Sequence, residues 1–183
     1  YLGGLLEHTL AVARLCLLLC DEHPELDREV LLVGAVFHDL GKAWEIEGGL
    51  TSDYTNDGRL LGHIVIGLEK VEPHLARTTD LPPELARHFK HIIVSHHGQY
   101  EFGSPQLPAT AEAMVLHHAD NLDAKLNMFA AVRRDLDKSG QQWSPFHRFL
   151  DRQVYLPPRT PREEKADRNA KKTEGQCSLP LKA

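Results

Sequence analysis

The stretch Val36-Phe37-His38-Asp39-Leu40-Gly41-Lys42 decides what fold and chemistry this chain is expected to have. A His-Asp dipeptide alone carries little information, but here residues that can bind a metal surround it in the chain. They are His8 upstream and His63, His96, His97 and Asp120 downstream. The ordered set His, His-Asp, His, His-His, Asp predicts a metal centre, because imidazole and carboxylate groups are the usual protein ligands of divalent transition metals.

The composition is that of a globular protein with one sizeable core. The chain has 183 residues, of which 42% are hydrophobic and 26% charged, which suits a single domain. Its apolar stretches are too short to span a bilayer, and no signal peptide opens it, so we expect a cytoplasmic protein without membrane contact. It also lacks an initiator Met, which favours a fragment whose N-terminal part is missing.

Charge and cysteine content narrow the function classes. The net charge of -5 does not indicate a nucleic-acid surface, although bound divalent cations would reverse the local field. Three cysteines without a disulfide framework predict reduced thiols, with Cys16 and Cys20 acting as small buried apolar residues and Cys177 in a polar tail. Twelve histidines are a heavy load for this length and need a functional explanation.

Hydrophobic periodicity predicts helices throughout, and hence an all-α fold without a significant sheet. The expected helices cover residues 5–20, 27–41 with Asp27 as N-cap, 59–72, a segment opened by Pro82-Pro83, and 110–136 with Thr110 as N-cap. Residues 48–58 and 98–108 are expected to be loops. The folded part is predicted to end at residue 156, followed by a flexible polar tail over 157–183 with seven basic and four acidic residues.

The metal-capable residues suggest a centre for one or two ions. His8, His38, Asp39 and Asp120 would hold one ion, and His63 with either His96 or His97 a second, with Asp39 bridging. Two such ions activate water and neutralise charge on a phosphate, so hydroxide on the metal would serve as nucleophile and no Ser or Cys is needed. Lys42, one turn beyond His38, is the candidate for contacting a phosphate oxygen.

Taken one at a time, these residues also have structural interpretations. A lone histidine such as His8 is usually a structural residue, and His96-His97 would interact favourably with a helix C-terminus. It is the combination and its order that favour the metal centre. Outside the set, His117 and His118 are expected to pack in the core, with support of a metal ligand as the alternative for His118. Five more are expected to be surface or structural residues: His23, His74, His88, His91 and His147.

Longer motifs add a resemblance to a known family. They are Gly-Gly-Leu-Leu-Glu-His-Thr (3–9), His-Asp-Leu-Gly-Lys (38–42), Leu-Leu-Gly-His-Ile (60–64), Ser-His-His-Gly (95–98), Glu-Phe-Gly-Ser-Pro (101–105) and His-Ala-Asp-Asn-Leu-Asp-Ala-Lys-Leu-Asn-Met (118–128). Over residues 3–158 the chain resembles HD-superfamily metal-dependent phosphohydrolases, and among them the YhaM-type 3'-to-5' exoribonucleases.

That resemblance implies an HD-domain helical bundle over residues 1–156 with the metal site in its core. It implies a phosphodiesterase that releases nucleotides from the 3' end of single-stranded RNA. Mn is the favoured metal, with Fe, Co, Ni, Zn and Mg as alternatives. The ligands would be His8, His38, Asp39, His63, His96, Asp120 and, as a further candidate, His97; the catalytic residues would be Asp39 and Lys42, with Lys42 also binding substrate.

The resemblance also implies an OB-fold domain ahead of the HD domain, and we expect none in this chain, which leaves no room for a five-stranded barrel. Either that domain was cut away or the chain is a stand-alone relative that acts on short substrates. Two other functions stay open: a nucleotidase or cyclic-nucleotide phosphohydrolase, and a non-catalytic nucleotide-sensing module. The residues after His96-His97 are Gly98-Gln99-Tyr100-Glu101 rather than Gly-Tyr-Pro, which argues against the cyclic-di-GMP branch. Apolar residues on the last helix would allow a homo-oligomer.

Overall fold

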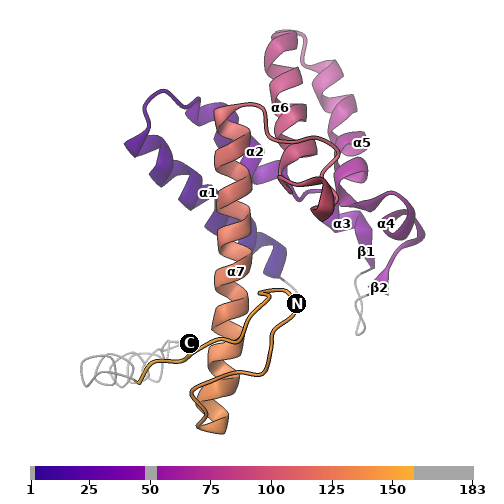
Figure 1. Ribbon diagram of the computed structural model, residues 1–183. Helices are drawn as coiled ribbons and strands as arrows, with labels where there is room; N and C mark the ends of the chain where they lie inside the picture. The colour runs from indigo at the N-terminus through magenta and orange to yellow at the C-terminus, as the bar shows by residue number, and fades with distance from the viewer. Residues whose placement is uncertain (1–2, 48–52, 159–183) are drawn as a thin grey trace, which may run out of the picture. The chain divides into compact units, whose positions relative to one another are not determined.

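The computed structural model describes residues 3–47 and 53–158 (Figure 1). Helices dominate, as the all-α prediction required. They are α1 (Gly4–Glu22), α2 (Arg28–Phe37), α3 (Lys42–Glu45), α4 (Asn56–Leu60), α5 (Gly62–Arg77), α6 (Pro83–Ser95), the 3-10 helix η1 (Tyr100–Phe102) and α7 (Ala111–Ser139). The strands in the described residues are β1 (Ile46–Glu47) and β2 (Asp53–Tyr54), which pair antiparallel with Ile46 opposite Tyr54. None of the described helices is long and apolar enough to cross a membrane.

Contacts divide the chain into two units, Tyr1–Leu126 and Asn127–Ala183, so that α7 contributes to both. The domain boundary predicted at residue 156 stays a prediction. Most of the predicted polar tail, including Cys177, lies outside the described residues.

The first unit is organised by two helix starts that the sequence indicates. The Asp27 carboxylate accepts hydrogen bonds from the backbone N–H groups of Glu29 and Val30, which caps α2. The Thr110 hydroxyl lies 3.2 Å from the backbone nitrogen of Ala113 at the start of α7. Both N-cap predictions are thereby confirmed, since side-chain oxygens satisfy amide groups that have no partner within the helix.

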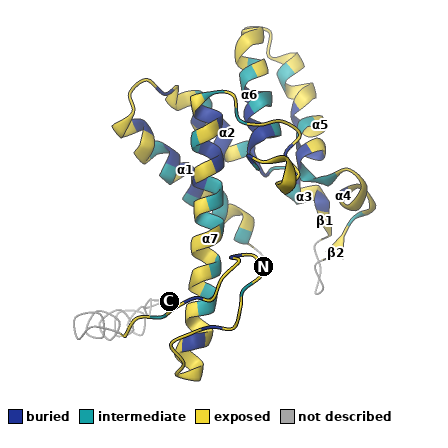
Figure 2. Ribbon diagram, viewed as in Figure 1, coloured by how far each residue is buried: buried dark blue, intermediate teal, exposed yellow. Residues whose placement is uncertain are grey.

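The core of this unit consists of two apolar clusters. One joins α1, α2, α6 and α7 and includes Val12, Cys16, Leu31, Ile92 and Leu116. The second lies between α5 and α6, around Ile64, Phe89 and Ile93. Figure 2 shows these inner helix faces as buried. Cys16 and Cys20 are buried free thiols, as predicted, and burial raises the pKa of Cys16 to about 12, so its thiol is unreactive.

The prediction of a loop over residues 48–58 is wrong for the second half of this segment. Residues 53–54 form β2, and α4 begins at Asn56. The Thr55 hydroxyl accepts a hydrogen bond from the N–H of Gly58 at 2.9 Å and so caps α4. The helix expected over 59–72 is displaced accordingly, because a break at Leu61 separates α4 from α5. Gly, Asp and Asn in this segment suggested a loop, but one capping side chain suffices for a single helical turn.

Gly41 allows α5 to lie against the His38-Asp39 turn. Its φ of -59° is ordinary for any residue, so its role is one of space. A Cβ at this position would lie 1.9 Å from the His63 carbonyl oxygen and 2.7 Å from the Gly67 nitrogen. Because both atoms belong to the backbone of α5, they cannot move aside as a side chain would.

Replacing Gly41 with alanine is therefore expected to destabilise the fold by about 2 kcal/mol or more, since extra atoms in a packed interior force the backbone apart. Thermal unfolding followed by circular dichroism measures the effect. Gly67→Ala is the matched comparison at the same contact, because its Cβ would lie 3.3 Å from the Gly41 nitrogen, which requires a shift of only a few tenths of an ångström, and alanine favours a helix. Equal midpoints for the two variants would contradict the prediction.

The second unit, as far as residue 158, is the C-terminal part of α7 followed by an irregular segment. Isolated bridges pair Trp143 with Tyr155 and His147 with Arg152. Leu136, Leu150 and Val154 are its buried apolar residues. None of the predicted metal ligands belongs to it.

Candidate metal centre

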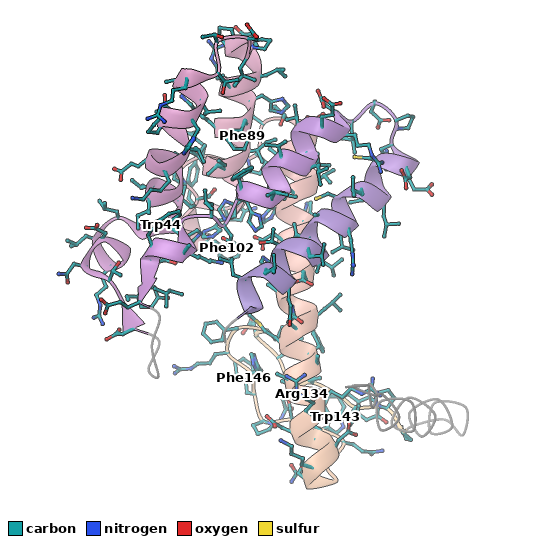
Figure 3. The ribbon with its side chains drawn as sticks, turned by 180° about the vertical axis from the view of Figure 1, so that it is seen from behind. Trp44, Phe89, Phe102, Arg134, Trp143 and Phe146 are labelled. Atoms are coloured by element: carbon teal, nitrogen blue, oxygen red, sulfur yellow. The ribbon has the colours of Figure 1, made fainter. Side chains whose placement is uncertain are left out.

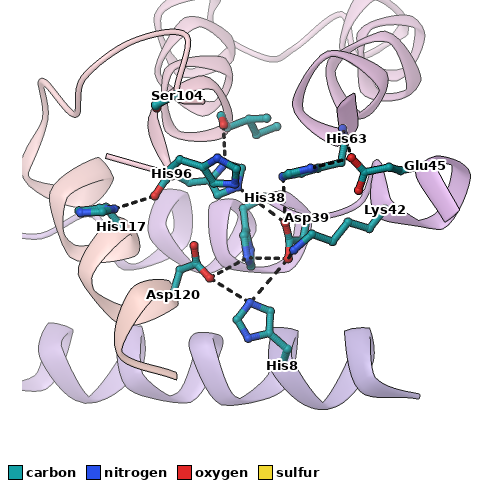
Figure 4. Close-up of polar contacts among 12 residues, drawn as sticks. His8, His38, Asp39, Lys42, Glu45, His63, His96, Ser104, His117 and Asp120 are labelled. Atoms are coloured by element: carbon teal, nitrogen blue, oxygen red, sulfur yellow. Dashed lines mark hydrogen bonds and ion pairs between the residues drawn. The ribbon is translucent and has the colours of Figure 1, made fainter. Parts of the chain in front are cut away.

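The predicted metal ligands come from five helical segments of the first unit and meet at one place (Figure 4). His8 lies within α1, and Asp120 lies within α7. The remaining ligand candidates follow or open a helix: His38 is the C-cap of α2, His63 is in the first turn of α5, and His96 is the C-cap of α6. Helix ends leave the chain free to turn, so the adjacent side chains of His38 and Asp39 reach the same space, as predicted.

The carboxylate of Asp39 lies at the centre of the group. Its Oδ1 is 3.4 Å from His63 Nε2 and 3.7 Å from His96 Nε2. Its Oδ2 is 3.6 Å from His8 Nε2 and 3.5 Å from His38 Nε2. The two oxygens thus face two different pairs of imidazoles.

The possible ligand atoms fall into two groups. His8, His38 and Asp39 form one, and His63, His96 and His97 form the other; within each group the ligand atoms lie within 4.8 Å of one another. Asp120 adds to the first, with Oδ1 3.0 Å from His8 Nε2 and 3.9 Å from His38 Nε2. The sequence left open whether His96 or His97 is used, and the structure brings both rings to the second group.

Four of the five histidine rings, those of His8, His38, His63 and His96, present Nε2 to the Asp39 carboxylate, and all five share one pattern at the other nitrogen. Their Nδ1 atoms are each within hydrogen-bonding distance of an oxygen: His38 with Ala35 O (2.8 Å), His96 with Ile93 O (2.7 Å), His97 with Phe102 O (2.7 Å), His8 with Asp123 Oδ2 (2.6 Å) and His63 with Glu45 Oε1 (3.3 Å). An Nδ1–H that donates to oxygen leaves the lone pair of the neutral ring on Nε2, which is the arrangement of metal-binding histidines.

Four buried polar atoms in this centre make no hydrogen bond to the protein: His38 Nε2, Asp39 Oδ1, His63 Nε2 and His96 Nε2. Buried polar groups are normally satisfied, and leaving one unpaired costs about 1–3 kcal/mol. Four in one place, all electron-pair donors, are accounted for by a cation among them. The residues present therefore fit a divalent metal with nitrogen and oxygen ligands.

Burial and neighbouring charges shift the pKa values of the same groups. Burial lowers the pKa of His38 to about 4 and also lowers the pKa of His63. Burial and the neighbouring His96 and His63 lower the pKa of His97 to about 4. At neutral pH these rings are thus uncharged and able to bind a metal. Burial opposes ionisation of Asp39, but the rings of His96 and His38 and the Lys42 ammonium together hold its pKa well below the usual range.

His8 differs from the other rings. Its hydrogen bond with Asp120 is the main reason that its pKa rises to about 9, against the opposing effect of burial. The same hydrogen bond lowers the pKa of Asp120, although burial acts to raise it. A cation at this position would compete with the proton that the raised pKa of His8 favours, since a histidine must be deprotonated to bind a metal.

Lys42 lies at the edge of the centre. Its Nζ is 2.6 Å from Asp39 Oδ2, and its side chain is 35% exposed. The ammonium group therefore pairs with the central carboxylate while remaining open to solvent. Its role toward substrate stays a prediction.

Three residues that support the ligands were missed or misjudged from the sequence. The buried Glu45 accepts hydrogen bonds from the backbone N–H of His63 (3.0 Å) and faces its ring. Asp123 holds His8. The buried His117 was expected only to pack, but its Nδ1 is 2.9 Å from the carbonyl oxygen of His96. His118 was expected to pack in the core, with support of a ligand as the alternative; it is exposed, so the core-packing prediction is wrong.

Replacing Glu45 with glutamine is expected to weaken metal binding about tenfold, because a neutral amide orients and polarises the His63 ring less than a carboxylate does. Titration of the metal-free protein with Mn²⁺ by isothermal calorimetry measures this. Glu47→Gln, an exposed change in β1, is the control and should bind like the unaltered chain. Equal affinities for both variants would exclude this role for Glu45.

The family model described as the HD domain matches residues 5–125, which include every residue of the centre. The chain belongs to the HD domain family.

Curated relatives of this HD domain are 3'-5' exoribonucleases named YhaM. The protein of Bacillus subtilis (strain 168) is 41% identical over 128 residues, covering 70% of this chain and 40% of the relative. That of Geobacillus sp. (strain WCH70) is 36% identical over 162 residues, covering 86% of this chain and 48% of the relative. The chain thus spans less than half the length of these relatives. It is an HD-domain relative of the YhaM exoribonucleases with clustered His and Asp side chains suited to divalent metal.

Among solved structures, the HD domain of the phosphodiesterase PgpH from L. monocytogenes aligns over 94% of this chain and 93% of its own. The sequence identity is 18% and the TM-score is 0.48. The family assignment above rests on the sequence match.

Proposed function

We propose that this HD domain is a metal-dependent phosphodiesterase that removes nucleotides from the 3' end of single-stranded RNA. The observation that carries the proposal is the position of Asp39, whose two oxygens face two separate groups of histidine Nε2 atoms. A carboxylate placed in this way suits a bridging ligand between two cations, and paired cations are typical of enzymes that cleave phosphate esters.

In this proposal the chain's own residues divide the work. His8, His38, Asp39 and Asp120 would hold one cation, and His63, His96, His97 and Asp39 would hold the other. Bound divalent cations lower the pKa of a coordinated water and neutralise charge on the phosphate. The Nδ1 hydrogen bonds keep the rings oriented, and the low pKa values of His38 and His97 keep them uncharged. The Lys42 ammonium group serves as the catalytic group that contacts a non-bridging phosphate oxygen.

The substrate part of the proposal is supported by relatedness. The curated relatives matched here carry the name 3'-5' exoribonuclease, and the match includes the segment that contains the metal centre. Mn²⁺ is the proposed metal because the resemblance to the YhaM-type exoribonucleases implies it; the mixed imidazole and carboxylate set is compatible with Mn²⁺ and equally with Fe, Co, Ni or Zn. The free-nucleotide and sensing alternatives lack an observation of their own.

The proposal is tested by incubating a 5'-labelled single-stranded RNA with the chain and Mn²⁺, beside bis(p-nitrophenyl) phosphate as a substrate without a base. A ladder of products that shorten from the 3' end is the expected result. Cleavage of bis(p-nitrophenyl) phosphate alone would support the phosphodiesterase chemistry but remove RNA as the substrate. No turnover of either would favour the sensing module.

A further inference from the structure

We propose that Phe102, together with Tyr100, forms a stacking surface for a nucleobase of the substrate beside the metal centre. This inference rests on the proposed function and specifies how its substrate is recognised. Both residues belong to the loop between α6 and α7, and their side chains are exposed and play no part in the core.

The loop is held in one conformation by its own backbone. Gly98 and Gly103 take positive φ values of 75° and 81°, which favour glycine. The Phe102 amide donates to Gln99 O at 3.1 Å, and the Gly103 amide donates to Tyr100 O at 3.0 Å. The buried Ser104 anchors the end of the turn, with its hydroxyl 3.1 Å from Val94 O on α6.

Despite this order, the two rings are in solvent. Tyr100 is 62% exposed and Phe102 is 59% exposed. A large aromatic side chain normally contributes stability by burial. The loop thus fixes the backbone under these rings without burying them, which is the arrangement of a preformed binding surface.

The same turn is tied directly to the metal centre. The carbonyl oxygen of Phe102 accepts the Nδ1 hydrogen bond of His97 at 2.7 Å, and the His97 ring lies 5.0 Å from the His63 ring, centroid to centroid. Phe102, labelled in Figure 3, is therefore one hydrogen bond away from a proposed ligand. A phosphate held at His63 and His97 would have its attached nucleoside within reach of this loop.

The chemistry of the surface indicates stacking rather than reading of base edges. A phenyl ring offers no hydrogen-bonding group, and the face of any nucleobase can stack on it. Recognition of this kind tolerates all sequences, as an enzyme that shortens RNA one nucleotide at a time requires. Stacking on one ring contributes about tenfold or more to affinity.

Phe102→Ala tests the inference, because it removes the ring but keeps the carbonyl oxygen that holds His97. Two quantities are measured in Mn²⁺: the Kd for a phosphorothioate RNA by fluorescence anisotropy, and kcat/KM for RNA relative to kcat/KM for bis(p-nitrophenyl) phosphate. We expect the Kd to rise and the ratio to fall about tenfold, with recovery in Phe102→Trp. Leu107→Ala, an exposed apolar change in the same loop, is the matched control.

The outcomes separate this inference from the proposed function. An unchanged Kd and an unchanged ratio in Phe102→Ala would overturn the stacking surface and leave the phosphodiesterase intact. A raised Kd in a chain that turns over no substrate would sustain the stacking surface and overturn the proposed function. A loss that Phe102→Trp does not recover, or that an RNA of the same length with abasic sites also shows, would exclude stacking as its cause.

Discussion

Replacing Asp39 with asparagine is expected to lower the hydrolysis of bis(p-nitrophenyl) phosphate by at least ~10³-fold, at the upper end of the loss seen for single electrostatic contacts in active sites. The reason is geometric. Each carboxylate oxygen of Asp39 faces a different group of histidines, whereas an asparagine offers one oxygen, no charge and an NH₂ group that repels a cation. Both proposed ions would lose a ligand through one substitution.

The variant should keep its helical circular dichroism spectrum while its bound metal, measured by elemental analysis, falls. Asp80→Asn is the control, because Asp80 is an exposed carboxylate in the turn between α5 and α6. It should keep both the metal and the rate. Full activity of Asp39→Asn would remove Asp39 from the mechanism, and loss of the helical spectrum would instead make it a structural residue.

Part of the clustering could be predicted because several candidate ligands sit where helices begin or end, whereas His8 and Asp120 lie inside α1 and α7. His38, Asp39 and His96 follow the last residues of α2 and α6, and His63 lies in the first turn of α5. Asp27 and Pro83 mark in the sequence where α2 and α6 begin, but α2 ends at Phe37 and not near Gly41 as predicted. The order of the histidines and aspartates then identified the set, and the structure brings all of its members together.

The supporting residues could not be predicted in this way. Glu45 is 18 positions from His63, and Asp123 is 115 positions from His8. Nothing in their spacing indicates contact, because each pair is created by the packing of separate helices. Only the close approach permitted by Gly41 brings α5 to the His38-Asp39 turn. For Asp123 the sequence held one signal. It lies three residues after Asp120, and residues three positions apart on a helix share a face.

For the candidate ligand His97, the sequence also could not predict its position. His97 is next to His96 in the chain, but adjacent residues on a regular helix point in different directions. Both rings reach the centre because α6 ends at Ser95 and the chain turns there. The hydrogen bond from His97 to Phe102 O then fixes the second ring. That bond depends on the loop conformation at Gly98 and Gly103, which composition alone describes only as a loop.

Two single variants, each lacking one ligand from a different group, distinguish the two proposed ions. His8→Ala and His96→Ala are each expected to lower the bound Mn²⁺ from two ions per chain to one, and to reduce hydrolysis by about 10²-fold or more. His8 and His38 share one oxygen of Asp39, while His63 and His96 share the other. Loss of one ring should therefore empty its own side first and leave the other three-residue group largely formed.

The measurement is Mn²⁺ stoichiometry by equilibrium dialysis, with His23→Ala as a control because the His23 side chain is 56% exposed and pairs with Glu25 far from the ligand set. Two ions in the control and one in each of the other variants would support a bridging Asp39. One ion in the unaltered chain, lost in both His8→Ala and His96→Ala, would mean that a single cation is shared by all the rings. Asp39 would then bind the cation through one oxygen, and its other oxygen would be held in place by Lys42 alone.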